Sequence, residues 1–358
     1  MAAWRRLRGS AATGALTADE RRDVVAGAAR LTRGLTGDRE LAGARYFDDT
    51  QLLGAYLLLY WPVSYAQARA VLAELRAPLG DVLDLGSGPG PLALAALDAG
   101  ATAARAIDRV PAALAIAKSL AADAGRALTV EAWDPSRPLP SGPFDTILAG
   151  HVINELYAGD LERRAALVLQ LLARLRPDGA LVIIEPALRE TSRALLQLRD
   201  RLLHEGASVR APCLYRGDCP ALVRPGDWCH AEQPWTAPPL VEELAQAAKL
   251  HRDSLKMTYL VLQPPSAGWP ALPDGRLFRI VSEPLPEKGK QRFVGCGPEG
   301  RFPLVLPDKH VRDNNRGFLD LQRGDLVRID RLATRGDGLR LDDQSDVHIV
   351  QPGGARNR

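Results

Sequence analysis

The sequence contains little cysteine. Four are present among 358 residues, and no two have the Cys-x2-Cys spacing that is common in zinc ribbons. Small secreted domains held by disulfides carry far more, so that class is excluded. No apolar run approaches the roughly eighteen residues that a membrane span needs, and no signal-peptide core is present. We therefore expect a cytoplasmic protein without a membrane segment.

A strong excess of either charge is also missing. The formal net charge is +3, from 46 lysines and arginines against 43 acids. Contact with nucleic acid must therefore come from a local patch and not from the charge of the whole molecule. The chain is long enough for two domains, each with its own core, and we expect a monomer.

The pattern of the chain changes twice. Residues 1–77 predict helices, including a capping box at Thr17-Ala-Asp-Glu20. Residues 78–286 alternate strand and helix, which predicts a parallel sheet covered on both faces. Residues 207–232 interrupt this pattern as a cysteine-rich insertion. Residues 287–358 predict a small β-rich domain. Within the α/β segment we expect strands at 81–85, 103–108, 128–133, 144–149 and 180–185.

A glycine-rich turn follows the first of these strands. It reads Asp84-Leu-Gly86-Ser-Gly88-Pro-Gly90 and leads into a helix. Glycine permits a tight turn and a close approach of the backbone to a ligand. Asp108 ends the next strand about 20 residues on, where a carboxylate can hold ribose hydroxyls. The pattern resembles Rossmann-like class I S-adenosylmethionine-dependent methyltransferases more than other nucleotide-binding α/β proteins.

Residues after the later strands extend this expected cofactor site. Trp133 and Asp134 end the third strand, where an adenine ring can stack on the indole and its amine can meet the carboxylate. His151 and Asn154 follow the fourth strand and are the candidate catalytic residues, as a base or a hydrogen-bonding group. Alternatively, Asn154 and Glu155 cap the following helix. Methyl transfer depends mainly on positioning, so a base is not obligatory.

Two signatures of base-methylating enzymes are absent. The Asn-Pro-Pro-Tyr or Asp-Pro-Pro-Tyr sequence of exocyclic-amine methylation does not occur; after the fourth strand the chain reads Gly150-His-Val-Ile-Asn-Glu-Leu156. Attack on cytosine C5 through a thiolate requires a cysteine near the fourth and fifth strands, and none is found there. The sequence therefore leaves the methylated atom open.

All four cysteines lie beyond the expected cofactor site. Cys213, Cys219 and Cys229 fall within seventeen residues, and Cys296 follows much later. Four thiolates at irregular spacing favour an iron–sulfur cube, whose irons occupy separate corners. His230 beside Cys229 leaves a Cys3His zinc site as an alternative, and ordinary buried thiols as another. Because Cys296 belongs to the C-terminal segment, a metal centre here would join two domains.

A short basic stretch precedes the last cysteine. Lys288, Lys290 and Arg292 are followed by Phe293. A basic loop that carries an aromatic ring suits a phosphate backbone with a base stacked beside it. Acids farther along the chain also allow a solvated surface of mixed charge. We predict RNA contact through the three cations.

Four short motifs of the chain are Pro212-Cys213-x5-Cys219-Pro220, Asp227-Trp-Cys229-His230, Cys296-Gly-Pro-Glu-Gly-Arg301 and Gly324-Asp325. Together they resemble the small-ribosomal-subunit methyltransferase-like family, whose mitochondrial members are small-subunit assembly factors. The resemblance implies a [4Fe-4S] cluster on the four cysteines, and S-adenosylmethionine at Asp84, Gly86, Gly88 and Asp108. It also implies association with the small ribosomal subunit and its rRNA. Two alternatives stay open: a non-catalytic RNA-binding assembly factor, and a zinc-stapled methyltransferase of a small molecule or protein.

Overall fold

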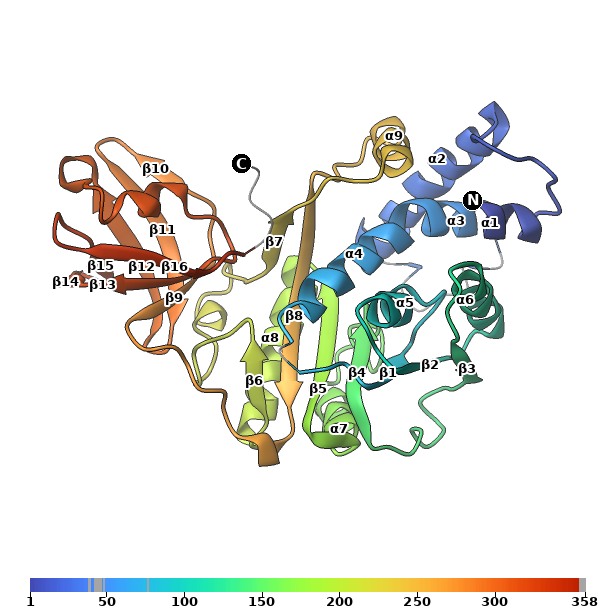
Figure 1. Cartoon of the computed structure of the whole chain (residues 1–358), viewed down its shortest axis with the longest axis horizontal. Helices are drawn as coiled ribbons and strands as arrows, with labels where there is room; N and C mark the ends of the chain where they lie inside the picture. Colours follow the sequence, from blue (N-terminus) through green and yellow to red (C-terminus); the bar gives the residue numbers. More distant parts are fainter. Residues whose placement is uncertain (38–39, 42–46, 48, 76, 354–358) are drawn as a thin grey trace.

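The computed structural model describes residues 1–37, 40–41, 47, 49–75 and 77–353. Two mixed sheets dominate this part of the chain and lie side by side (Figure 1). The first sheet contains β1 (Asp81–Leu85), β2 (Ala103–Asp108), β3 (Thr129–Ala132), β4 (Phe144–Gly150), β5 (Leu175–Pro186), β6 (Ser208–Ala211), β7 (Ala231–Pro234) and β8 (Ser254–Gln263).

The first sheet has the order β3-β2-β1-β4-β5-β8-β6, with β7 also paired to β8. Strands β1 to β5 run parallel to one another, whereas β8 runs antiparallel to β5. The middle residues of β1, β2 and β4, such as Leu83, Ile107 and Ile147, are apolar and buried, as expected for a sheet covered on both faces. The predicted Rossmann-like α/β class is confirmed.

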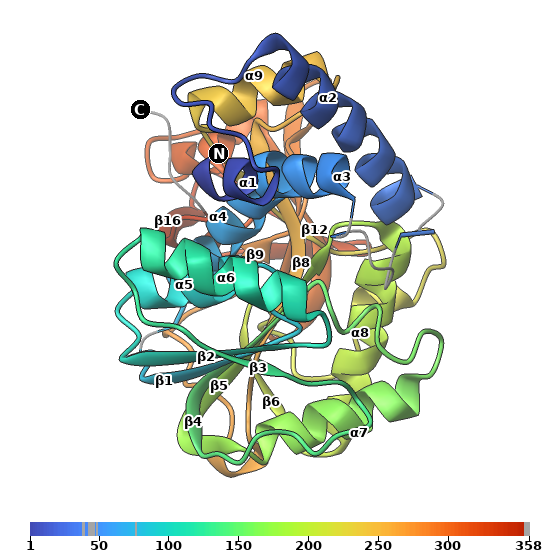
Figure 2. The same cartoon turned by 90° about the vertical axis from the view of Figure 1, so that its right-hand side faces the viewer.

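Helices cover both faces of this sheet (Figure 2). On one face lie α4 (Trp61–Leu72), α5 (Pro91–Asp98) and α6 (Pro111–Asp123); on the other lie α7 (Leu161–Leu172) and α8 (Arg189–His204). Both α5 and α6 begin with proline, which is pre-organised for a first helical turn. The N-cap of α7 is Asp160, so the idea that Asn154 and Glu155 cap this helix is wrong.

The N-terminal segment forms a separate layer above the sheet. Its elements are α1 (Ala2–Leu7), α2 (Ala18–Thr32), η1 (Arg33–Gly37), α3 (Thr50–Ala55) and η3 (Tyr56–Tyr60), and α9 (Pro239–Ala247) packs with them. The predicted capping box of α2 is confirmed, since Thr17 accepts from the Glu20 amide and Glu20 accepts from that of Thr17. The helical extension packs against the α/β domain at Ile116 of α6.

The second sheet is built from the C-terminal part of the chain. Its order is β14-β15-β12-β11-β9-β13-β16, with β10 on β11. Strand β9 precedes residue 287, so the sheet begins before the predicted start of the C-terminal domain. The strand is short and has prolines on both sides, so the sequence pattern did not indicate it. The strands are β9 (Leu277–Ile280), β10 (Leu285–Glu287), β11 (Lys290–Gly297), β12 (Gly300–Pro307), β13 (Leu326–Asp330), β14 (Ala333–Arg335), β15 (Gly338–Arg340) and β16 (Asp346–Gln351).

The cysteine-rich segment joins the two sheets. It runs between β6 and β7, both of which pair with β8, so its two ends belong to the first sheet. Leu214 of this segment packs against Leu277 and Leu326 of the second sheet. None of the helices in the described part of the chain has the length and apolar character needed to cross a membrane.

Candidate functional site

The first candidate site is a cavity of about 460 Å³ at the carboxyl ends of β1, β2 and β4. Ligands of open parallel sheets bind at this edge, and cavities of roughly 300–1,000 Å³ suit small molecules. The predicted residues that line it are Asp84, Gly86, Gly88, Asp108, Trp133, His151 and Asn154. We refer to it as the cofactor cavity.

The glycine turn has the backbone that its sequence predicts. Gly86, Gly88 and Gly90 have φ values of +64°, +51° and +74°, which disfavour any side chain. A Cβ at Gly86 would also clash with Val152. Gly90 is not among the lining residues: a Cβ there would lie 3.0 Å from Cβ of Ala117, so this glycine lets α5 and α6 pack closely.

Two acids hold this turn, of which Asp84 is buried and Asp108 is half-buried. Asp84 accepts the Ala93 amide of α5 through Oδ2 at 2.9 Å. Asp108 accepts the Gly88 and Val110 amides, each at 2.8 Å. Burial raises the pKa of Asp84 to about 8 and raises the pKa of Asp108 as well. Both acids thus fix the turn, and both line the cavity.

Of the two residues predicted to hold adenine, only one lines the cofactor cavity. Trp133 is buried and lines the cavity, and its indole Nε1 donates to the Pro138 carbonyl at 3.1 Å. Asp134 is not among the lining residues, because its carboxylate accepts the Ser136 amide at 2.8 Å in a local turn. Pro135 lies at the cavity instead. The structure therefore brings the indole to the site but not the neighbouring acid.

His151 lines the cavity together with a residue that the sequence analysis missed. Its Nε2 lies 3.2 Å from Oε1 of Gln67, a residue of helix α4. Burial lowers the pKa of His151 to about 4, so the ring is neutral at neutral pH. Nothing in the local pattern around Gln67 indicates this contact, because it depends on how the helical extension packs.

Asn154 also lines the cavity, and a second missed residue orients it. Its backbone amide donates to Oε1 of Glu185 at 2.9 Å, and its side-chain amide donates to the other carboxylate oxygen. Glu185 lies near the end of β5 and is 1% exposed; burial raises its pKa to about 8. A signal was available, since Glu185 ends an apolar strand as Asp108 does.

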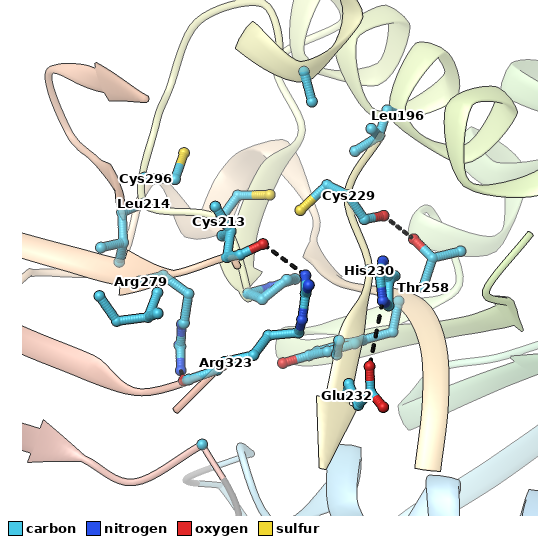
Figure 3. A pocket seen from close by; sticks show the side chains of 18 of the residues that line it. Leu196, Cys213, Leu214, Cys229, His230, Glu232, Thr258, Arg279, Cys296 and Arg323 are labelled. Atoms are coloured by element: carbon cyan, nitrogen blue, oxygen red, sulfur yellow. Dashed lines mark hydrogen bonds and ion pairs between the residues drawn. The ribbon is translucent and has the colours of Figure 1, made fainter. Parts of the chain in front are cut away.

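The second candidate site is a cavity of about 70 Å³ between the two sheets, lined by all four cysteines, Cys213, Cys219, Cys229 and Cys296. In this measure a single water needs roughly 10–15 Å³. Figure 3 shows the side chains of Cys213 and Cys229 pointing toward each other. All four are free thiols. Burial and the neighbouring thiols raise the pKa of Cys296, and burial raises that of Cys219 to about 12 and of Cys229 to about 11. We refer to it as the cysteine cavity.

Helix α8 holds the loop that carries three of these thiols. The buried guanidinium of Arg199 donates to the Gly217 carbonyl at 2.8 Å and to that of Tyr215. Asp200 accepts the Cys219 amide at 2.8 Å, and Arg193 donates to the Arg224 carbonyl at 3.0 Å. These bonds satisfy loop carbonyls that lie away from any strand or helix partner, and they fix the loop against α8.

The Cys3His zinc alternative requires His230 as the fourth ligand beside three cysteines. Within the described ranges, no group of three or more His, Cys, Asp or Glu side chains is placed to hold one metal ion. His230 stacks on Trp228 at 4.3 Å between ring centroids, and its Nε2 lies 3.7 Å from Glu232 (Figure 3). The Cys3His arrangement is therefore not formed among the described residues.

The predicted basic patch is partly neutralised. Lys290 and Arg292 each lie 2.8 Å from Glu287, across the turn between β10 and β11. Lys288 is exposed in that turn. Phe293 is fully buried and packs edge-to-face on Phe318, with ring centroids 5.2 Å apart. The prediction that this aromatic stacks on a base is wrong, because residue 293 faces the core of the second sheet.

The sheet order, the antiparallel β8 and the glycine turn at the cofactor cavity define a class I S-adenosylmethionine-dependent methyltransferase fold. Within this class, the chain belongs to the family described as mitochondrial small ribosomal subunit Rsm22, whose model matches residues 52–340. The family suggested by the cysteine motifs is thereby confirmed. No curated protein sequence matches the chain.

Several solved structures resemble parts of this chain. The mitomycin 7-O-methyltransferase MmcR is 17% identical, with a TM-score of 0.40 over 68% of this chain and 67% of that one. The glycopeptide N-methyltransferase MtfA, complexed with sinefungin, is 18% identical, with a TM-score of 0.38 over 56% and 87%. A putative RNA methyltransferase PH1948 from Pyrococcus horikoshii is 13% identical, with a TM-score of 0.36 over 57% and 84%.

Proposed function

We propose that this protein binds S-adenosylmethionine in the cofactor cavity and methylates RNA of the small ribosomal subunit during its assembly. The observation that carries the proposal is the cavity itself, where the glycine turn, Asp108 and Trp133 meet at the carboxyl edge of the sheet. The small-subunit role comes from the family match. The site of action is then the cytoplasm, where small subunits and free thiols coexist.

A transfer assay tests this function. The purified protein is mixed with methyl-labelled S-adenosylmethionine and with small subunits, both mature and from cells that lack the protein. The proposal expects label in the RNA of the immature subunits. If the donor binds and no label reaches RNA or protein, the chain is instead a non-catalytic assembly factor. Label on protein or on a small molecule would contradict the RNA assignment.

We further propose that Cys213, Cys219, Cys229 and Cys296 hold a [4Fe-4S] cluster. Support comes from the cavity that all four thiols share and from the cysteine motifs of the sequence. In such a cluster each thiolate binds a different iron, so the four sulfurs need not converge on one point. When bound, the cluster would supply a covalent link between the two sheets, because Cys296 lies on β11 and the other three on the loop of the first sheet.

RNA contact is proposed at the β10–β11 turn, through Lys288, Lys290 and Arg292. Support comes from the exposure of Lys288 and from the position of the other two cations on the same hairpin. The ion pairs with Glu287 reduce the local positive charge, so this surface is a weak electrostatic site by itself. The bulk of the affinity for a subunit must then come from additional surfaces.

A further inference from the structure

A chain of hydrogen bonds fixes the orientation of Gln67 beside the cofactor cavity. Its Nε2 donates to the backbone carbonyl of Lys256 at 3.0 Å. That carbonyl belongs to β8, which is held by ladders on both sides. Gln67 is 4% exposed, so an unsatisfied amide group there would be expensive. Because the NH2 group must face the carbonyl, the Oε1 atom faces His151.

This orientation determines the proton of the imidazole ring. Oε1 of Gln67 can only accept a hydrogen bond, so Nε2 of His151, 3.2 Å away, must donate one. In a neutral ring with hydrogen on Nε2, the Nδ1 atom is an acceptor. An amide partner, unlike a carboxylate, does not stabilise the imidazolium form. Burial also lowers the pKa of His151, so it favours the neutral ring as well.

We propose that Gln67 fixes His151 as the hydrogen-bond acceptor that positions the methyl-accepting group, and that this group is a nitrogen or oxygen carrying a hydrogen. The inference rests on the proposed function and names the acceptor class of the same cavity. Gln67 is a positioning residue, whereas His151 contacts the substrate. In the reaction the carbon–sulfur bond of the sulfonium breaks, the nitrogen–carbon or oxygen–carbon bond forms, and the acceptor proton passes to water.

The lining of the cavity agrees with this acceptor class. Methylation of a pyrimidine carbon requires a nucleophile that first adds to the ring, and cysteine is the usual one. None of the described residues that line the cofactor cavity is a cysteine. A nitrogen or oxygen acceptor needs only orientation close to the donor methyl group. A neutral histidine that accepts its hydrogen bond provides that orientation.

Nitrogen-15 NMR of histidine-labelled protein tests the first half of the proposal without turnover. The chain has 6 histidines, and His151→Gly assigns the signal. Glycine is the suitable replacement because residue 151 has a φ of +58°. At pH 7 we expect a neutral ring with hydrogen on Nε2. In Gln67→Met the other tautomer should appear. A wild-type ring that is cationic, or that carries its hydrogen on Nδ1, would overturn the assignment.

Methyl transfer to immature small subunits tests the second half, with the product located by nuclease digestion and mass spectrometry. We expect the methyl group on nitrogen or oxygen, and a loss of about 10²-fold or more in His151→Gly at unchanged donor affinity. Methyl on carbon, or full activity of His151→Gly, contradicts the proposal. If wild-type protein binds the donor and transfers nothing, the proposed methyl transfer is refuted together with the role of His151, while the cofactor site stands. Failure to bind the donor refutes the proposed function itself.

Discussion

Arg301 and Asp227 form an ion pair across the boundary between the two sheets, with Nη1 and Oδ2 3.3 Å apart. Arg301 lies directly opposite Cys296 in the β11–β12 ladder. Asp227 lies two residues before Cys229 in the cysteine loop. The pair therefore connects the immediate surroundings of two proposed cluster ligands that are far apart in the sequence. It places the thiol from the second sheet relative to the thiols from the first.

Loss of this ion pair should reduce retention of the proposed metal centre more than it reduces the free energy of unfolding. In Arg301→Gln or Asp227→Asn we expect faster loss of iron in air, with a stability change of about 1 kcal/mol or less because the pair is partly exposed. Arg276→Gln is the matched control, since Arg276 pairs with Glu299 at 2.6 Å within the second domain. Equal iron loss in control and test variants, followed by absorbance, would remove the special role of Arg301.

The iron and sulfide content should depend on every cysteine. Anaerobically purified protein should contain about four iron and four labile sulfide per chain, and Cys296→Ser should lose them. Because Cys296 is the single ligand from the second sheet, this variant should also become more sensitive to protease between residues 263 and 277. One zinc without sulfide would refute the cluster and favour a zinc-stapled methyltransferase.

The buried acid of the glycine turn should make stability depend on pH. The pKa of Asp84 is about 8 in the folded protein, against an ordinary 3.8. Between these values the folded state holds a proton that the unfolded state releases, so this group lowers stability as pH rises from about 4 to 8. Asp84→Asn keeps an oxygen that can accept from the Ala93 amide. The melting temperature of this variant minus that of wild type should therefore increase as the pH rises over that range. A difference independent of pH would contradict the raised pKa.

Neutralising Glu287 should strengthen RNA binding. Glu287→Gln releases Lys290 and Arg292 from their ion pairs, so affinity for single-stranded small-subunit RNA should rise and the salt dependence should steepen by about 0.7 per new phosphate contact. Lys288→Ala should lower both. Glu283→Gln is a control on the same domain, because Glu283 pairs with Arg323 outside this hairpin. Unchanged affinity in all three variants, measured by fluorescence anisotropy, would exclude this surface.

Local pattern was sufficient for the sheet and the glycine turn but not for the groups that orient the site. Strand β2 was predicted to the residue, since an apolar run ending in Asp108 is a local signal. Gln67 contacts a carbonyl 189 residues away, and no local pattern specifies such a contact. Arg199 was missed for the same reason: its partners lie in a loop without periodicity.

Binding of S-adenosylmethionine, measured by calorimetry, tests the central claim most directly. A Cβ at Gly88 would lie 3.8 Å from Phe47 and Tyr56, so alanine meets no close protein atom there and is expected to crowd the bound cofactor. Gly125 has a similar positive φ, +66° against +51°, and open space around it. We expect one donor bound per chain in wild type and Gly125→Ala, and none in Gly88→Ala. No binding by wild type, or equal binding by all three, would contradict the account.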